Sequence, residues 1–387
     1  MKKVVGIDIG NAKTEIAFEH NKEVRFERIP SVTSYLTSVP DAPDIPLDKA
    51  VEDLLNNIVV YFSSTAVKQN GNYFVGKRAL QSDRQKNVLN LQLGGKSDND
   101  IPIISSLSLV AASSVKEYFE ENQALPESLQ IELKMVTAIP SSEFNTETSA
   151  KLTNRFKGIH NLTLYVSDQQ VSVTIKVSEC RVTEEGKTSM LAFAYSSPDI
   201  LSLYNAQYNE NKKPSDFLSS RSLHTDIGDG TTEFTVIDGV NPVPGQSEGI
   251  RSGVGHASEE AAKLLKKDST MSISSKFTRQ AFQEWLKRDD LKGDLARDYM
   301  NRSIYSQAQS ISEQIQTAFQ ELAASDISYL FVHGGGSVTF KDALKEELTL
   351  FTKNNFCKLV WIPEEYASNM NSRGTFILAK NLYQSKK

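Results

Sequence analysis

Two short glycine-containing stretches constrain the fold of this chain more than any other feature of its sequence. The first, residues 6–14, reads GIDIGNAKT, and the second, residues 225–233, reads TDIGDGTTE. Each contains an apolar run, an Asp, a turn with glycine and a second β-prone run, which is typical of a β-hairpin. We therefore expect two similar hairpins that carry Asp8 and Asp226 near the ends of their first strands.

This pattern suits a phosphate group held together with a metal ion. Glycine lets backbone N–H groups approach an anion closely, and a fixed carboxylate can anchor the hydrated Mg²⁺ that accompanies a nucleotide. A third stretch, residues 329–337, reads YLFVHGGGS and shows the same order of a β-prone run followed by glycines. A single glycine hairpin is more often a plain turn, but three in this order predict one nucleotide held between two similar halves.

Composition limits the class of protein. The chain has 387 residues, enough for two domains, and its 39% hydrophobic and 24% charged residues are typical of a soluble globular protein. The formal net charge of −5 argues against a broad nucleic-acid surface, so we expect any contact with DNA to pass through another protein. Cys180 and Cys357 lie far apart without a histidine cluster, which favours neither a zinc site nor a disulfide framework. The apolar run at residues 4–9 is too short for a signal or membrane segment, and we expect a cytoplasmic protein.

The hydrophobic pattern predicts alternating strands and helices, an α/β layout. The expected strands are 4–9, 13–19, 24–29, 59–62, 73–75, 133–139, 162–166, 171–177 and 327–332, with a short one at 359–362. The expected helices are an amphipathic one at 107–119, helical segments within 188–208 and from 255, and further helices at 304–322, 341–351 and 364–383.

Together these motifs resemble the actin, sugar-kinase and heat-shock chaperone ATPase superfamily, and within it the ParM (StbA) group of plasmid-segregation actins. The matching segments are the two phosphate hairpins at 6–18 and 225–237, the adenosine motif at 331–337, NSRGTF at 371–376 and YFVG at 73–76 with Ala79. The resemblance implies an actin-like fold, with two similar ribonuclease H-like α/β domains around a nucleotide cleft. Domain I would comprise 1–195 with 363–387, and domain II 196–362.

The resemblance also implies how ATP and Mg²⁺ are held, with GTP left open as an alternative. Asp8 and Asp226 would hold the metal through water. The remaining nucleotide-binding residues would be Gly10, Asn11, Ala12 and Lys13 in the first turn, Gly228, Asp229, Gly230 and Thr231 in the second, and Gly334, Gly335 and Gly336 against the adenine. Lys13 or Asn11 would contact the β-phosphate.

The catalytic residues implied are Asp226 and an acidic residue just before the first connecting helix. We prefer Glu185 as the residue that orients the water and keep Glu184 in reserve, although such carboxylates are equally often solvated loop residues. Two departures from the group stand out. Glu233 replaces the usual Asp, and Asp229 adds a negative charge beside phosphate that a cation or the backbone must offset. His224 and His333 lie in apolar strands, and we expect them to be core or edge residues rather than catalytic bases.

The function implied is that of an actin-like ATPase whose nucleotide-dependent filaments segregate plasmid DNA. Its partners would be other copies of the chain and a small DNA-binding adaptor protein on a centromere-like site, with no direct nucleic-acid or membrane contact. An actin-fold scaffold without a role in segregation and a small-molecule kinase remain as alternatives, because the fold alone does not choose among them. A chaperone would need a substrate domain after the ATPase.

Overall fold

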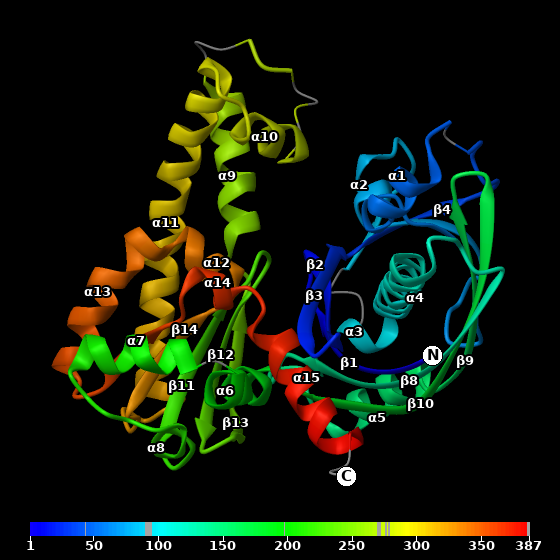
Figure 1. Ribbon diagram of the computed structural model, residues 1–387. Coiled ribbons are helices and arrows are strands. Elements are labelled where there is room, and N and C mark those ends of the chain that lie inside the picture. The colour runs from blue at the N-terminus through cyan, green and yellow to red at the C-terminus, as the bar shows by residue number, and fades with distance from the viewer. Residues whose placement is uncertain are drawn as a thin grey trace. The chain divides into compact units, whose positions relative to one another are not determined.

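The computed structural model describes residues 1–42, 44–89, 95–196, 198–268, 272–274, 277 and 279–384, and the chain forms two compact units (Figure 1). Unit 1 comprises Met1–Ser196 and Asn371–Lys387, and unit 2 comprises Ser197–Met370. Residues 363–370 fall in unit 2 in this division. The functional domain boundaries expected from the sequence, near 195 and 362, stay a prediction.

Unit 1 contains a large mixed sheet with the strand order β3-β2-β1-β8-β10-β9-β5-β6-β4-β7. β1 pairs with β2 antiparallel and with β8 parallel, and β8 pairs with β10 parallel. The strands of the described residues are β1 (Lys2–Ile9), β2 (Lys13–His20), β3 (Glu23–Pro30), β4 (Val32–Leu36), β5 (Val59–Ser63), β6 (Gly71–Val75), β7 (Asn87–Val88), β8 (Ser128–Ile139), β9 (Gly158–Val166) and β10 (Gln169–Glu184).

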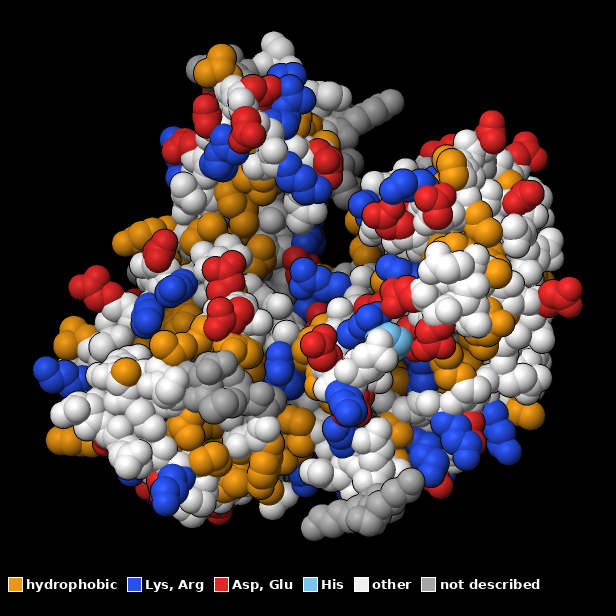
Figure 2. Space-filling view, viewed as in Figure 1, with side chains coloured by type: hydrophobic (Ala, Val, Ile, Leu, Met, Phe, Trp, Pro, Cys, Tyr) orange, Lys and Arg blue, Asp and Glu red, His pale blue; other side chains and the backbone are white. Residues whose placement is uncertain are grey.

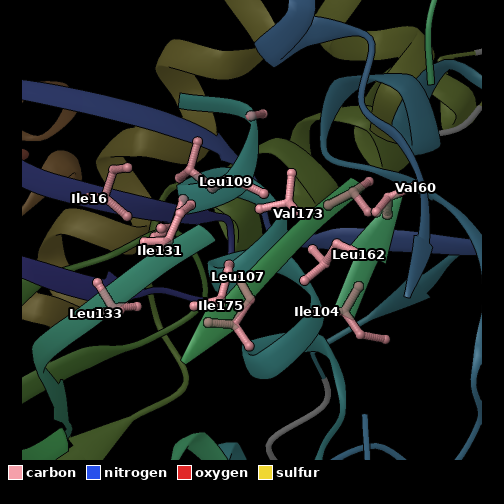
Figure 3. Close-up of a cluster of buried hydrophobic side chains, with 14 of the residues drawn as sticks. Ile16, Val60, Ile104, Leu107, Leu109, Ile131, Leu133, Leu162, Val173 and Ile175 are labelled. Atoms are coloured by element: carbon pink, nitrogen blue, oxygen red, sulfur yellow. The ribbon is translucent and has the colours of Figure 1, made fainter. Parts of the chain in front are cut away.

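Helix α4 (Ile101–Asn122) forms the centre of unit 1, and the curved sheet surrounds it in Figure 1. The sequence predicted a shorter, amphipathic helix at 107–119. The observed helix is longer and buried around its circumference as far as Val115, because strands flank it on several sides. In Figure 3, Leu107 and Leu109 point toward strand side chains such as Val173. The other helices are α1 (Leu47–Glu52), the 3₁₀ turn η1 (Leu54–Asn56), α2 (Lys77–Gln81), α3 (Gly95–Asp98), α5 (Thr146–Phe156), α6 (Glu185–Ser196) and α15 (Met370–Tyr383).

Unit 2 is built on a smaller sheet with the order β13-β12-β11-β14-β15. Its strands are β11 (Arg221–Ile227), β12 (Thr232–Asp238), β13 (Asn241–Ile250), β14 (Tyr329–His333) and β15 (Lys358–Trp361). Its helices are α7 (Pro198–Tyr208), α8 (Pro214–Leu218), α9 (Val254–Lys267), α10 (Arg279–Leu286), α11 (Leu291–Glu321), α12 (Gly335–Thr339), α13 (Lys341–Asn354) and α14 (Glu364–Ala367). The closing helix expected at 364–383 is thus two helices, α14 and α15, with a break between them.

The two units repeat one strand arrangement, which agrees with the expectation of two similar α/β halves. In unit 1 the antiparallel meander β3-β2-β1 continues into the parallel strands β8 and β10, and in unit 2 the meander β13-β12-β11 continues into β14 and β15. Both predicted glycine hairpins therefore lie at the same point of an equivalent sheet. Among the described residues, no helix combines the length and hydrophobicity needed to cross a bilayer.

Candidate functional site

The two glycine turns have matching geometry. Gly10 donates its backbone N–H to the carbonyl of Lys13 at 2.8 Å, and Gly228 donates to the carbonyl of Thr231 at 2.8 Å. A Cβ at Gly10 would lie 2.9 Å from the Lys13 oxygen, and one at Gly228 would lie 3.0 Å from the Thr231 oxygen. Both predicted hairpins are confirmed, and each needs glycine at the first turn position because a side chain would crowd the turn.

The two aspartates occupy equivalent places in the two hairpins. Asp8 lies opposite Glu15 in the β1–β2 pair, and Asp226 lies opposite Glu233 in the β11–β12 pair. Each aspartate stands two residues before its turn glycine, on a strand with neighbours on both sides. The sheets thus fix the backbone that carries each carboxylate.

The first turn is fastened by Ser31, which the sequence analysis did not single out. Its hydroxyl donates to the carbonyl of Gly10 at 2.7 Å, and its backbone N–H donates to the carbonyl of Ala12 at 3.0 Å. Asn11 has a buried amide oxygen without a hydrogen-bond partner among the described residues. An amide oxygen that has no hydrogen-bond partner in the protein can accept a hydrogen bond from a ligand or from a water bound to that ligand.

Lys13 is engaged with the protein in this structure. Its ammonium donates to Glu15 at 3.0 Å, and Glu15 also accepts a hydrogen bond from the hydroxyl of Ser372 at 2.5 Å. Glu15 is almost completely buried. A contact between Lys13 and a β-phosphate would require the ammonium to exchange this carboxylate for phosphate, and it stays a prediction.

Glu185 is the first residue of α6, and Glu184 is the last residue of β10. The ammonium of Lys96, on α3, lies 2.6 Å from Glu185 Oε1 and is only 3% exposed. Burial, and then the charge of Glu185, raise the pKa of Asp8 to about 7. Although burial disfavours an ammonium, the carboxylates of Glu185 and Asp8 raise the pKa of Lys96. These three charged groups therefore form one electrostatic cluster.

The position of Lys96 is set by a network centred on Arg155. The Arg155 guanidinium donates to the carbonyls of Ser97 and Asn99 at 2.9 and 2.6 Å and pairs with Asp100 at 2.5 Å. These bonds fix the backbone that directly follows Lys96. The sequence analysis did not single out Lys96, because it lies in no recognisable motif and its partner Glu185 is 89 residues away along the chain.

The second turn contains its own counter-charge. One nitrogen of Arg279, at the start of α10, donates to both carboxylate oxygens of Asp229 at 2.7 and 2.8 Å. The carbonyl of Asp229 accepts the N–H of Gly255, near the start of α9, at 2.7 Å. The sequence analysis expected a cation or the backbone to offset the Asp229 charge. In the structure a side chain of the same unit pairs with it.

The glycine triplet packs against the end of β11. A Cβ at Gly334 would lie 2.2 Å from Asp226 Oδ1, and one at Gly336 would lie 2.6 Å from the side chain of Ile227. Gly334 also has a φ of +87°, which favours glycine. A Cβ at Gly335 would meet nothing within 4 Å. Two of the three glycines are thus required by the packing of the protein itself, and Gly335 has open space beside it.

His224 and His333 are core residues, as expected. Both are 2% exposed, and burial lowers the pKa of each imidazole. His224 stacks on Phe331 with a centroid separation of 4.4 Å. His333 Nδ1 lies 3.7 Å from Asp226 Oδ2, and neither His333 nitrogen has a hydrogen-bond partner in the described structure. A neutral imidazole with unmet bonding capacity therefore stands beside Asp226.

The segment 371–376 packs α15 against α6 and β1. A Cβ at Gly374 would lie 1.8 Å from the carbonyl of Thr188, and the Thr188 hydroxyl donates to Asn371 at 3.0 Å. A Cβ at Gly6 would lie 2.1 Å from the backbone nitrogen of Phe376. Close backbone contact at Gly6 therefore joins the last helix to the strand that carries Asp8, and close contact at Gly374 joins the same helix to α6.

The residues present fit a nucleotide with its Mg²⁺ better than a metal held by the protein alone. The described ranges contain no group of three or more His, Cys, Asp and Glu residues suited to a metal ion. Mg²⁺ bound with a nucleotide keeps several waters and takes one or two protein carboxylates along with phosphate oxygens. In unit 1, Asp8 and the unpartnered amide oxygen of Asn11 beside the first turn suit such an ion, and in unit 2 Asp226 stands at the equivalent place beside the second turn.

Comparisons with known proteins agree with this architecture. Residues 6–187 match the family model of the N-terminal domain of actin-like proteins, and residues 224–346 match that of the C-terminal domain of the archaeal MreB-like actin homologue. No curated protein matches the sequence.

Solved structures resemble the whole chain. ParM of Bacillus thuringiensis with ATP is 14% identical, with 99% of this chain and 100% of that chain covered and a TM-score of 0.65. The actin-like protein Alp7A is 14% identical, with 98% and 96% covered and a TM-score of 0.67. The archaeal actin homolog Ta0583 is 16% identical, with 98% and 99% covered and a TM-score of 0.63. At these identities the likeness concerns the fold, which is that of actin with two α/β domains.

Proposed function

Because this chain belongs to the actin-like proteins and has their fold, we propose that it is an ATPase whose nucleotide-dependent filaments segregate plasmid DNA. The observation that carries the proposal is the pair of glycine turns with the same hydrogen bond, each preceded by an aspartate at the same position. Two matched phosphate hairpins are what a protein needs to hold a nucleotide triphosphate from both of its halves. The ParM of Bacillus thuringiensis, similar in fold, was solved with ATP, with ADP and with AMPPNP.

The proposed roles follow from the chemistry of each group. ATP with Mg²⁺ supplies the phosphoanhydride bond that is cleaved. Asp8 and Asp226 hold the hydrated ion, and the backbone N–H groups of the two turns bind phosphate oxygens. Glu185 orients the attacking water, while the ion pair with Lys96 fixes the Glu185 carboxylate in place. Phosphoryl transfer depends mainly on such positioning and on charge stabilisation.

Filament growth would provide the force that moves DNA. We propose that ATP favours the polymer and that hydrolysis weakens it, so that growing filaments separate plasmid copies. The net charge of −5 supports contact with DNA through a small DNA-binding adaptor on a centromere-like site rather than direct binding. An open reading frame for such an adaptor beside the gene would support this part of the proposal.

Sedimentation with and without ATP tests the proposed function. We expect a pellet that depends on ATP, with phosphate release that follows polymer formation. A stable monomer that phosphorylates a sugar would favour the kinase alternative instead. A polymer that recruits no plasmid DNA when the neighbouring adaptor is added would favour a scaffold without a role in segregation.

The Glu185→Gln variant should slow ATP hydrolysis about a hundredfold and leave ATP-dependent pelleting intact, because the amide cannot accept the proton of an attacking water. Lys96→Met should slow hydrolysis similarly and also lower the unfolding midpoint, since it removes the ammonium that pairs with the largely buried carboxylate of Glu185. The double variant should recover stability without recovering hydrolysis. Phosphate release and thermal melts measure both quantities.

Glu184→Gln is the matched control, because Glu184 is the adjacent carboxylate and the ammonium of Lys96 pairs with Glu185. Loss of hydrolysis in this variant, with normal turnover in Glu185→Gln, would transfer the water-orienting role to Glu184. Normal hydrolysis in Lys96→Met would remove Lys96 from the proposed mechanism.

A further inference from the structure

Phe356 is an aromatic side chain that packs against nothing in its own fold. It follows helix α13 in unit 2 and is 97% exposed. The described hydrophobic clusters of unit 2 do not include it, although they include Phe351 and Cys357 on either side. Figure 2 shows hydrophobic and charged side chains interspersed over the surface of α7 and α13.

The backbone at Phe356 is also unusual for a bulky residue. Its φ is +57°, in the left-handed region. The N–H of Phe356 points to the carbonyl of Lys353 at 3.4 Å, and the N–H of Cys357 donates to the carbonyl of Thr352 at 3.0 Å. This is a Schellman motif, whose left-handed position is normally glycine or asparagine. Single exposed hydrophobic residues are common, but a fully exposed ring at a strained position is not explained by the stability of unit 2.

Unit 1 contains a pocket of about 520 Å³ whose lining combines apolar side chains with polar and charged ones. Its lining includes Ala50 and Leu54 from the core side, Val166 at the end of β9, and Ile45, which is partly exposed. The pocket is large enough for an aromatic ring together with part of its flanking chain, because sites for small ligands begin near 300 Å³. Nothing in the proposed nucleotide site uses it.

The charges around the two features are complementary. Asp41 and Asp168 line the pocket, and Arg78 in the same lining lies over the ring of Phe74. Lys353, three residues before Phe356, is exposed, whereas Lys358 on the other side is paired with Glu210. Opposite charges at the rim of a contact favour encounter in one orientation.

We propose that Phe356 of one copy of this chain inserts into the unit 1 pocket of a second copy. The projecting ring and the pocket are different surfaces of the same chain, so the contact is heterologous. Such a contact repeats from copy to copy and builds an open polymer unless its rotation closes a ring. The inference rests on the proposed function, since it assigns a contact within the proposed filament.

Replacement of Phe356 by glycine separates folding from assembly. Glycine suits the left-handed backbone, so Phe356→Gly should raise the unfolding midpoint of the monomer and retain nucleotide binding. It should also raise the critical concentration for ATP-dependent pelleting at least about tenfold, as expected for loss of an aromatic anchor. Phe356→Tyr keeps the ring and is the matched control, with a critical concentration within about twofold of the unmodified chain.

Cross-linking tests the identity of the pocket. A mixture of the Phe356→Cys and Ile45→Cys variants, oxidised after ATP addition, should give a covalent dimer that contains one copy of each. The natural thiols of Cys180 and Cys357 are buried, so the unmodified chain should give little cross-link. Because a disulfide requires Cα atoms within about 7 Å, the product reports direct proximity.

The outcomes distinguish this inference from the proposed function. If the unmodified chain forms no pellet with ATP, the proposed function fails and this contact fails with it. If the unmodified chain pellets and Phe356→Gly pellets at the same concentration, only the Phe356 contact is overturned. A dimer formed by Phe356→Cys alone, or a polymer without the mixed cross-link, would likewise exclude the pocket as its partner.

Discussion

Replacing Asp226 by asparagine should reduce ATP hydrolysis by about 10³-fold or more while leaving the fold intact. Asparagine has nearly the same shape, so its contact with Gly334 and its place opposite Glu233 are retained. The change removes the negative charge that is proposed to hold hydrated Mg²⁺ in unit 2. Losing one preorganised electrostatic contact in an active site commonly costs 10²–10³-fold, and weaker metal binding adds to this.

Phosphate release measured across a Mg²⁺ titration tests this expectation, with thermal unfolding as the check on folding. The Asp238→Asn variant is a suitable control, because Asp238 is an exposed carboxylate at the far end of the neighbouring strand β12. Hydrolysis by Asp226→Asn within tenfold of the unmodified chain would contradict the proposed role of Asp226. Asp226→Ala should also abolish hydrolysis, but it removes the packing against Gly334 as well.

The hairpins could be predicted from the sequence because their signals are local. A glycine turn between two β-prone runs fixes strand, turn and strand within ten residues, and β1, β2, β11 and β12 form as expected. Local periodicity likewise predicted the helical character of α13 and of the second half of α11. The order of the motifs along the chain predicted that the protein has two halves with similar α/β folds.

The remaining features depend on contacts between distant parts of the chain. Lys96 meets Glu185, and Arg279 meets Asp229, at separations that no local pattern encodes. The burial of α4 could not be predicted from its periodicity, because the surrounding sheet is formed by strands from across unit 1. The metal and nucleotide contacts expected at Asp8, Asp226 and the two turns stay predictions.

The glycines illustrate how one residue type carries two kinds of information. At Gly10 and Gly228 the requirement is the turn itself, which a sequence pattern reveals. At Gly374 glycine is required because α6 packs so closely that a Cβ would lie 1.8 Å from the carbonyl oxygen of Thr188. Only the structure reveals this contact. The NSRGTF segment was singled out by resemblance alone, and its glycine has a packing role that is independent of any nucleotide.

Replacing Gly374 by alanine should therefore destabilise unit 1 by about 3 kcal/mol or more, despite the gain of about 1 kcal/mol that alanine normally brings to a helix. The new methyl group would overlap the carbonyl of Thr188, and backbone atoms cannot move aside as a flexible side chain can. Gly335→Ala is the matched control, since it also adds a methyl group to a helical glycine but meets nothing within 4 Å. Its unfolding midpoint without nucleotide should stay close to that of the unmodified chain. Urea unfolding of both variants measures the difference, and equal stabilities would show that α6 and α15 can separate at little cost.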